Sequence, residues 1–167
     1  MTRSRKKAAV PLSKLRTSEA IKTVVNHPRR LEELVGMLQD KDRTLRGRAA
    51  AMLARLSESH AGRLFRILDR IKDGLADDSA YVRWHLAYTL GLVGVRFPNR
   101  SSLFVTELGA RLDDENRIVR AFASNALAQI AERKPEVVKT LFETTKRETP
   151  ASVARVLHKP AKGAPKK

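Results

Sequence analysis

The sequence predicts an all-α fold, a right-handed solenoid of helical hairpins with a 37-residue period. Three segments align without a gap at this spacing: LQDKDRTLRGRAAAMLARL (38–56), LADDSAYVRWHLAYTLGLV (75–93) and LDDENRIVRAFASNALAQI (112–130). Within each segment the apolar residues recur at spacings of four, four and three, which places them on one face of a helix. Regular repetition of a helical unit is typical of chains whose neighbouring units stack into an elongated array.

Each repeat is predicted to contain two helices. The second helix carries the apolar face of the aligned segment, for example Leu86 and Leu90 in the middle repeat. The first helix lies upstream and carries apolar residues in a helical register, such as Leu68, Ile71 and Leu75. Because each helix has one apolar face, the two are expected to pack against each other as a hairpin.

The turn between the two helices is marked by one column of the alignment, which holds Asp42, Ser79 and Asn116. All three residue types are strong N-caps, since their short side chains accept hydrogen bonds from free backbone amides. Pro28 and Pro135 stand where first helices should begin, and proline suits a first helical turn. These signals predict where the helices of each hairpin start.

The helical part is expected to span residues 17–158, between two basic, disordered tails at 1–16 and 159–167. The net charge is +16, and all 18 acidic residues lie between the tails, so much of the excess positive charge sits at the two ends. Charged segments with few apolar residues cannot bury enough surface to fold. The helical part divides into a capping helix at 17–26, three full repeats at about 28–60, 61–97 and 98–134, and a partial fourth repeat.

Composition argues against catalysis and against bound cofactors. The chain has no cysteine, which excludes disulfides and thiolate metal sites, and its four histidines are scattered without metal-ligand spacing. Gly91 and Gly94 follow no strand, so they indicate helix packing and helix termination, not a phosphate-binding loop. The sequence therefore predicts a protein that is not an enzyme and that holds no cofactor and no metal.

No apolar run approaches the roughly 18 residues that a membrane span needs, so we expect no membrane partner. The predicted compartment is the cytoplasm, or the nucleoid or nucleus for a nucleic-acid-binding protein. The opening MTRSRKKAAVPLSKLR is basic and free of acidic residues, so a mitochondrial transit peptide is an alternative interpretation. The sequence does not determine the oligomeric state, and the expectation is a monomer.

The middle repeat, LADDSAYVRWHLAYTLGLVG, resembles the HEAT-repeat family in its Leu, Asp, Val-Arg and late Leu-Gly positions. The third repeat matches well, whereas the first departs with Leu45 in place of Val and Ala54 in place of Gly. The likeness covers about residues 28–148. It specifies a fold, a short HEAT-like solenoid, better than it specifies a function.

The resemblance implies that two columns of the alignment form an ion-pair ladder between neighbouring repeats. The aspartate column is Asp40, Asp77 and Asp114, and the arginine column is Arg46, Arg83 and Arg120. A cation in or near the first turn of a helix opposes the helix dipole and needs an acidic partner, which independently favours this ladder. The alternative is that these arginines bind phosphate.

A further set of columns is predicted to face away from the core. Positions 44, 48, 51 and 55 and their counterparts in later repeats line one solvent face of the solenoid, normally the concave one. The candidate partner-binding residues on and beside this face are Arg48, Arg55, Tyr81, Trp84, His85, Tyr88, Phe122 and Asn125. Exposed aromatic residues clustered with arginine are typical of binding hot spots. The alternative is that Trp84 and Tyr88 only fill ridges between neighbouring helices.

The predicted function is that of a non-enzymatic scaffold that binds an acidic protein or peptide through the second-helix face, as the HEAT resemblance implies. An alternative is binding of DNA or RNA, with Arg48 and Arg55 at phosphates, Trp84, Tyr81 or Phe122 stacked on bases, and the basic tails adding nonspecific attraction. A remote alternative is an enzyme similar to DNA alkylation-repair glycosylases, which use a HEAT-like solenoid. The outward columns lack the aspartate or glutamate that such chemistry needs.

Overall fold

The structure, a computed structural model, describes residues 9–158, and each predicted hairpin is present. The first helices are α2 (Leu31–Leu38), α4 (Leu68–Asp73), α6 (Val105–Ala110) and α8 (Pro135–Thr145). The second helices are α3 (Arg43–His60), α5 (Ala80–Arg96), α7 (Arg117–Arg133) and α9 (Ala151–Leu157), and α1 (Thr17–Asn26) precedes the first hairpin. Short 3-10 helices join these elements: η1 (Leu12–Lys14), η2 (Pro28–Arg30), η3 (Ala61–Ile67), η4 (Gly74–Ala76), η5 (Pro98–Leu103) and η6 (Arg111–Asp113).

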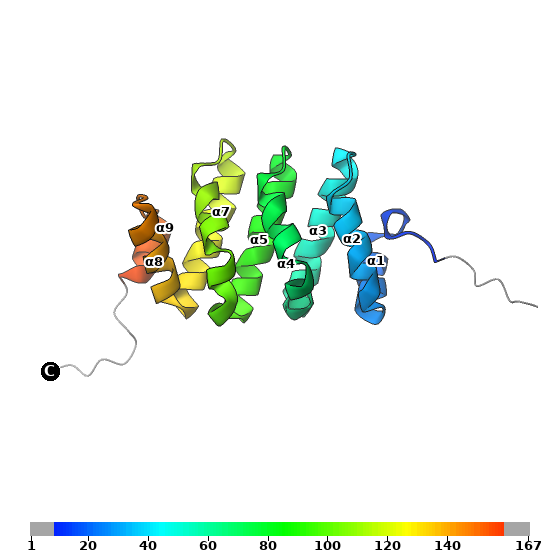
Figure 1. Cartoon of the computed structure of the whole chain (residues 1–167), viewed down its shortest axis with the longest axis horizontal. Helices are drawn as coiled ribbons and strands as arrows, with labels where there is room; N and C mark the ends of the chain where they lie inside the picture. The colour runs from blue at the N-terminus through cyan, green and yellow to red at the C-terminus, as the bar shows by residue number, and fades with distance from the viewer. Residues whose placement is uncertain (1–8, 159–167) are drawn as a thin grey trace, which may run out of the picture.

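The hairpins stand side by side in one elongated row, which runs from α1 to α9 along the long axis of the molecule (Figure 1). The second helices contact one another in the order α3, α5, α7 and α9. Residues 9–158 contain no strand, so the predicted all-α solenoid of helical hairpins is confirmed. Within the same range no helix is long and apolar enough to cross a membrane.

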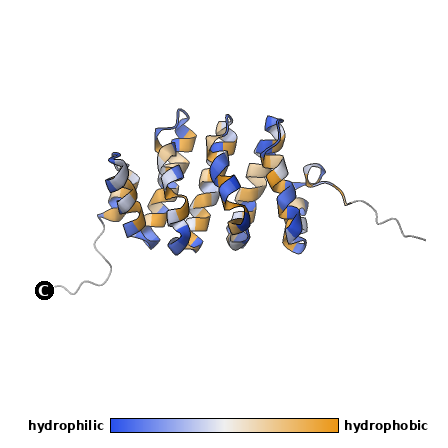
Figure 2. Ribbon diagram, viewed as in Figure 1, coloured by the Kyte–Doolittle hydropathy of each residue, from blue (hydrophilic) through white to orange (hydrophobic). Residues whose placement is uncertain are grey.

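The core lies between the two helices of each hairpin and between neighbouring hairpins. Leu53 of α3, Leu90 of α5 and Leu127 of α7 occupy one column of the repeat and are each fully buried. Burying such a side chain stabilises the fold by about 1.5–3 kcal/mol. Leu45, at the start of α3, is only half-buried, so the first turn of that helix lies at the rim of the core. Figure 2 shows hydrophilic residues at the turns along one edge of the row.

The first helices of the middle and third repeats are short. Helix α4 lies between η3 and η4, and α6 lies between η5 and η6, so one continuous first helix per repeat is only partly confirmed. Pro98 opens η5, where its missing amide leaves no helical hydrogen bond unmade. Gly74 opens η4 beside α5, where an added Cβ would lie 2.4 Å from a methyl carbon of Leu86. Glycine at this position lets the first helix approach α5 closely.

The N-cap prediction is confirmed at two of its three positions. The side chain of Asp42 accepts a hydrogen bond from the amide of Thr44 at 2.8 Å. The side chain of Asn116 accepts from the amides of Ile118 and Val119. Ser79 stands at the N-cap of α5, but its hydroxyl makes no capping hydrogen bond. The start of α5 therefore lacks the side-chain cap that α3 and α7 have.

The solenoid begins earlier than the predicted boundary at residue 17. Leu12, in η1, is fully buried, and its amide donates to a carboxylate oxygen of Glu33 at 2.5 Å. Arg30 donates to the carbonyl oxygen of Val10 at 2.7 Å. The prediction of disorder is wrong for residues 9–16, because one apolar side chain and these hydrogen bonds hold them on α2. The remaining tail residues, 1–8 and 159–167, lie outside the described residues.

Two glycines allow the close packing of α5 on α7. Gly91 and Gly94 were expected to serve packing and termination, and only packing is confirmed, because α5 continues to Arg96. A Cβ added to Gly91 would lie 2.9 Å from the Cβ and 3.2 Å from the Cα of Ala126. A Cβ added to Gly94 would lie 2.5 Å from a side-chain carbon of Ile130. Glycine at both positions therefore leaves no room for a larger side chain between α5 and α7.

Candidate functional site

The predicted ladder columns make ion pairs between neighbouring repeats. The Nε and Nη2 atoms of Arg83 each donate a hydrogen bond to Asp114 of the next repeat, both at 2.8 Å. Its Nη1 atom donates to the carbonyl oxygen of Asp77 in its own repeat, also at 2.8 Å. Arg46 makes the same connection one unit earlier, with its Nε atom 2.7 Å from the Asp77 carboxylate. Each of these arginines thus joins the turn of its own hairpin to the turn of the next.

The pair of Arg83 and Asp114 is almost fully buried, with side chains that are 6% and 3% exposed. Burial raises the pKa of Asp114, but hydrogen bonds from Arg83 and the amide of Asn116, together with the charge of Arg83, outweigh it and hold the pKa below its usual value. The hydrogen bond to Asp114 raises the pKa of Arg83. Both groups are therefore charged and satisfied by each other, which favours a structural role over phosphate binding.

The ladder stops at both ends of the array. The residue 37 positions after Asp114 is Ala151, so Arg120 meets no aspartate in the following unit. Its Nη1 atom donates to the carbonyl oxygen of Asp114 at 2.7 Å, and the residue is exposed. At the other end, the carboxylate of Asp40 accepts the amide of Asp42 at 2.8 Å. Arg120 is thus an arginine of the same column without the buried ion pair.

Two adjoining pockets open on the second-helix face, the surface formed by α1, α3, α5 and α7. The first, here called the arginine pocket, has a volume of about 840 Å³ and is lined by residues that include Arg16, Arg43, Thr44, Arg48, Ser79 and Tyr81. The second, here called the aromatic pocket, has a volume of about 340 Å³ and is lined by residues that include Arg55, Glu58, Trp84, His85, Tyr88 and Phe122. Thr17 and Ala51 line both, so the two form one continuous groove.

Two other rings stack on the indole of Trp84. The ring of His85 stacks on it with centroids 3.5 Å apart, and the ring of Phe122 stacks on it with centroids 4.8 Å apart. His85 belongs to the same helix as Trp84, and Phe122 belongs to α7. Tyr88 meets Phe122 edge-on at 6.0 Å. The aromatic residues therefore bridge α5 and α7, and stacking by two neighbouring rings leaves Trp84 only partly exposed.

His85 does not face solvent as predicted. It is 8% exposed, and its Nδ1 atom lies 2.8 Å from the carbonyl oxygen of Tyr81, one helical turn earlier. Because a carbonyl only accepts, Nδ1 carries the proton in the neutral ring. Burial lowers the pKa of His85 below its usual value, and the hydrogen bond to Tyr81 offsets part of this effect. The ring turns back along α5 to stack on Trp84, which a simple count of outward positions does not reveal.

We expect the protein to lose stability on acidification through His85. A histidine whose folded pKa is lowered stabilises the fold fully above its unfolded pKa, near 6.5, and this contribution is lost as the pH falls below that value. Between pH 7.5 and 5.5 the free energy of unfolding should fall more in the wild type than in His85→Asn. Urea unfolding at the two pH values measures the difference. Equal pH dependence in both proteins would contradict the assignment.

The remaining predicted residues differ in how free they are to bind. Tyr81 is 50% exposed, lines the arginine pocket and contacts the ring of His85, which lines the aromatic pocket. Arg48 donates from Nη2 to the carbonyl oxygen of Leu15, while its buried Nε atom has no hydrogen-bond partner among the described residues. Arg55 is exposed and pairs with Glu58 at 3.3 Å. Asn125 is exposed on α7 and lines neither pocket, so the structure does not bring it together with the others.

The groove residues that the sequence analysis missed include Arg16, Arg43, Glu58 and Ser79. The signal for Glu58 was present, because the outward spacing 44, 48, 51, 55 continues to 58. Its carboxylate corrects the expectation that this face lacks an acidic group, although the ion pair with Arg55 occupies it. Arg16 was assigned to a disordered tail, and Ser79 was assigned only a capping role.

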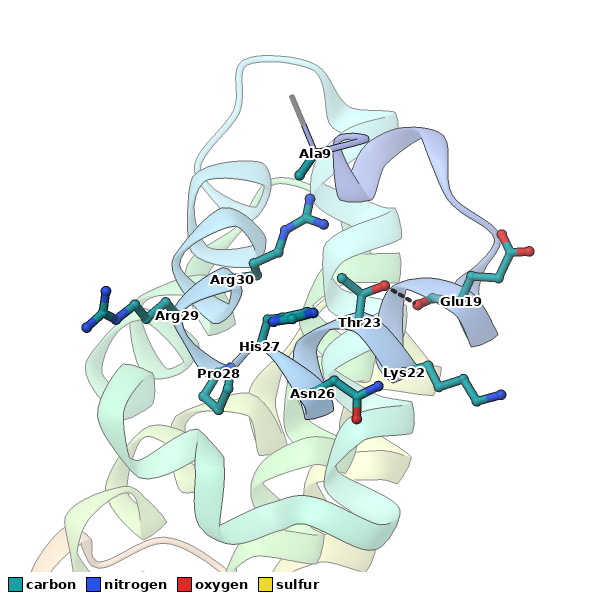
Figure 3. Close-up of a pocket in the computed structure, with 9 residues that line it drawn as sticks. All are labelled: Ala9, Glu19, Lys22, Thr23, Asn26, His27, Pro28, Arg29 and Arg30. Atoms are coloured by element: carbon teal, nitrogen blue, oxygen red, sulfur yellow. Dashed lines mark hydrogen bonds between the residues drawn. The ribbon is translucent and has the colours of Figure 1, made fainter. Parts of the chain in front are cut away.

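A further pocket lies at the N-terminal end of the row, between α1 and η2 (Figure 3). It has a volume of about 780 Å³ and is basic, with Lys22, His27, Arg29 and Arg30 among its lining residues. The guanidinium of Arg30 is already paired with Glu33 at 2.6 Å. Figure 3 shows the side chains of Lys22 and Arg29 extending away from each other. These cations do not converge on one point, so this pocket is a weaker candidate than the groove.

Sequence comparison assigns the repeats to a family. The family described as HEAT repeats matches residues 68–158, which is more than half of the chain. The chain belongs to the HEAT-repeat family. No curated protein matches this HEAT-repeat chain.

Solved structures of designed repeat proteins share the fold of this HEAT-repeat protein. An engineered protein has 20% sequence identity and a TM-score of 0.58, over 83% of this chain and 63% of that one. A designed armadillo repeat protein in complex with the peptide (KR)4 has 17% identity and a TM-score of 0.60, over 83% and 65%. Another, computationally designed for modular peptide recognition, has 18% identity and a TM-score of 0.64, over 87% and 69%. The HEAT-repeat chain thus spans just under two thirds of the length of the first two.

Proposed function

We propose that this HEAT-repeat protein is a non-enzymatic scaffold that binds an acidic segment of another protein along the second-helix face. The observation that carries the proposal is the continuous groove, in which an apolar aromatic pocket adjoins a pocket lined by three arginines. Protein-binding hot spots combine aromatic anchors and arginine in this way. A peptide with an apolar side chain next to acidic side chains fits both halves at once.

The charge of the groove selects an acidic occupant. The designed armadillo repeat protein of similar fold is in complex with the basic peptide (KR)4. The groove of the present chain is lined by Arg16, Arg43, Arg48 and Arg55, with Glu58 as its acidic residue. A peptide of lysine and arginine would be repelled here. Bringing like charges together in a partly desolvated site makes the free energy of binding less favourable by roughly several kcal/mol.

The stacking of the aromatic residues favours a polypeptide over a nucleic acid. Binding of single-stranded nucleic acid relies on bases that stack on exposed aromatic faces. The rings of His85 and Phe122 already stack on Trp84, which is only partly exposed. Tyr81 is the large aromatic residue of the groove with substantial exposure. One ring is a poor platform for successive bases, whereas a partly open apolar pocket suits a side chain of a peptide.

Selection of random peptides displayed on phage against the immobilised full-length protein tests the proposal. We expect enrichment of peptides that carry acidic residues next to an aromatic or aliphatic residue. Tyr81→Ala should weaken a selected peptide about tenfold, the effect expected of a hot-spot residue. Leu103→Ala is the matched control, because Leu103 is equally exposed, at 49% against 50%, but lies on η5 outside the groove.

Two results would count against the proposal. Selected peptides without excess acidic residues would contradict the charge argument. Equal losses of affinity in Tyr81→Ala and Leu103→Ala would show that the groove is not the binding surface.

A further inference from the structure

The arginine pocket gathers positive charge without a carboxylate of its own. Arg16 comes from the N-cap of α1, and Arg43 and Arg48 come from the first turns of α3. No aspartate or glutamate is among the residues that line the pocket. The nearby carboxylate of Asp78 is paired with Arg46 of the ladder. Three guanidinium groups around one cavity repel one another, and a bound anion would relieve this repulsion.

Within residues 9–158, one donor of this pocket is buried without a partner, and a second side chain at its edge makes no cap. The Nε atom of Arg48 is inaccessible and has no hydrogen-bond partner among the described residues. Ser79 is 2% exposed, and its hydroxyl makes no capping hydrogen bond although it stands at the N-terminus of the 17-residue helix α5. A buried polar group without a partner costs about 1–3 kcal/mol, so such groups usually mark the place of a ligand or water. Both residues line the same cavity.

The uncapped start of α5 also favours an anion in the arginine pocket. The side chains of Asp42 and Asn116 cap α3 and α7, whereas no side chain caps α5. The free amides and the dipole at the start of a long helix favour negative charge. In α5 this end lies at the arginine pocket, which Ser79 and Tyr81 line together with the three arginines.

We propose that the arginine pocket binds the phosphoryl group of a phosphorylated serine or threonine in the acidic partner segment, an inference that rests on the proposed function. A carboxylate has two oxygens in one plane, which a single arginine can satisfy. The arginine pocket is lined by arginines from two elements and by Ser79 at the start of a third, so donors can approach an anion from more than one plane. A phosphoryl group presents three acceptor oxygens and nearly two negative charges to such a site.

The neighbouring aromatic pocket points to a polypeptide as the carrier of the phosphoryl group. It shares Thr17 and Ala51 with the arginine pocket, so a residue next to the phosphorylated one can place an apolar side chain there. Successive nucleotides would need several free rings to stack on, and Tyr81 is the strongly exposed ring of the groove, while His85 and Phe122 already stack on Trp84.

Binding of three matched peptide libraries to the full-length protein tests the inference. Each library has degenerate flanks around one fixed residue, which is phosphoserine, serine or glutamate. We expect the phosphoserine library to bind at least about tenfold tighter than the other two, measured by fluorescence anisotropy at fixed ionic strength. Arg48→Gln and Arg43→Gln should each remove about tenfold of this preference, and Arg70→Gln, an exposed arginine on α4, should leave it unchanged.

The outcomes separate this inference from the proposed function. Arg48→Gln also removes a hydrogen bond to Leu15, so Arg43→Gln, at an exposed position, decides the result if the first variant unfolds. Equal binding of the phosphoserine and serine libraries, with a loss in Tyr81→Ala, would overturn the phosphoryl site and leave the scaffold function standing. No binding by any library would overturn both. Displacement of the phosphoserine library by oligonucleotides, at lower concentrations than by phosphopeptides, would overturn the polypeptide partner in favour of nucleic acid.

Discussion

Replacing Arg83 by alanine is expected to lower the free energy of unfolding by about 3 kcal/mol, because the buried carboxylate of Asp114 loses its two hydrogen bonds from Arg83 and keeps only the amide of Asn116 and the more distant Arg111, at 3.5 Å. The same change removes the hydrogen bond from Nη1 to the carbonyl oxygen of Asp77. In a chain of this length each kcal/mol of unfolding free energy corresponds to about 2–4 °C in melting temperature. The melting temperature should therefore fall by about 10 °C. Thermal unfolding followed by circular dichroism measures the shift.

Arg120→Ala is the matched control. Arg120 occupies the same column and makes the same hydrogen bond to a carbonyl oxygen of its own turn, but it has no aspartate in the following unit and is exposed. Its loss should cost less than about 1 kcal/mol. If the two variants melted at the same temperature, the buried ion pair would not be what joins the repeats. Loss of binding without loss of stability in Arg83→Ala would restore the functional interpretation of the arginine column.

Gly91→Leu is expected to destabilise the protein by about 2–3 kcal/mol, because it forces α5 away from α7. The added Cβ alone would lie 3.2 Å from the backbone Cα of Ala126, and no flexible side chain can move to make room. The higher helix propensity of leucine offsets less than about 1 kcal/mol of this cost. Chemical denaturation of the full-length protein measures the change.

Gly36→Leu makes the same chemical change where there is space. Gly36 is an exposed residue of α2, and a Cβ added there would meet no atom within 4 Å. Helix propensity then acts alone and should stabilise the protein by about 0.5–1 kcal/mol. Destabilisation of similar size in both variants would show that the close approach of α5 and α7 does not set the cost at Gly91.

The fold was predictable because every signal for it is repeated. Leu53, Leu90 and Leu127 hold one column and are all fully buried, so an apolar pattern that is ambiguous in one helix becomes decisive in three. The ladder was predictable for the same reason, since Arg46 and Arg83 meet the next aspartate of the column in successive repeats.

The groove was only partly predictable, because its residues do not share a column. Arg16 precedes the first repeat and reaches the pocket only because α1 packs against α3. His85 occupies an outward position, yet its ring turns back to the carbonyl oxygen of Tyr81 and is buried against Trp84. Neither feature follows from helical periodicity, since one depends on how a non-repeated helix docks and the other on the rotamer of a single side chain.

The most direct test of the groove follows the emission of Trp84, the single tryptophan, which lines the aromatic pocket. The full-length protein would be titrated with an acidic peptide selected by display, and separately with single-stranded and duplex oligonucleotides at two salt concentrations. We predict a saturable change in emission with the peptide that is lost in Tyr81→Ala, and oligonucleotide binding that weakens steeply with salt without changing the emission. Saturable quenching of Trp84 by oligonucleotides, with no response to the peptide, would contradict the account.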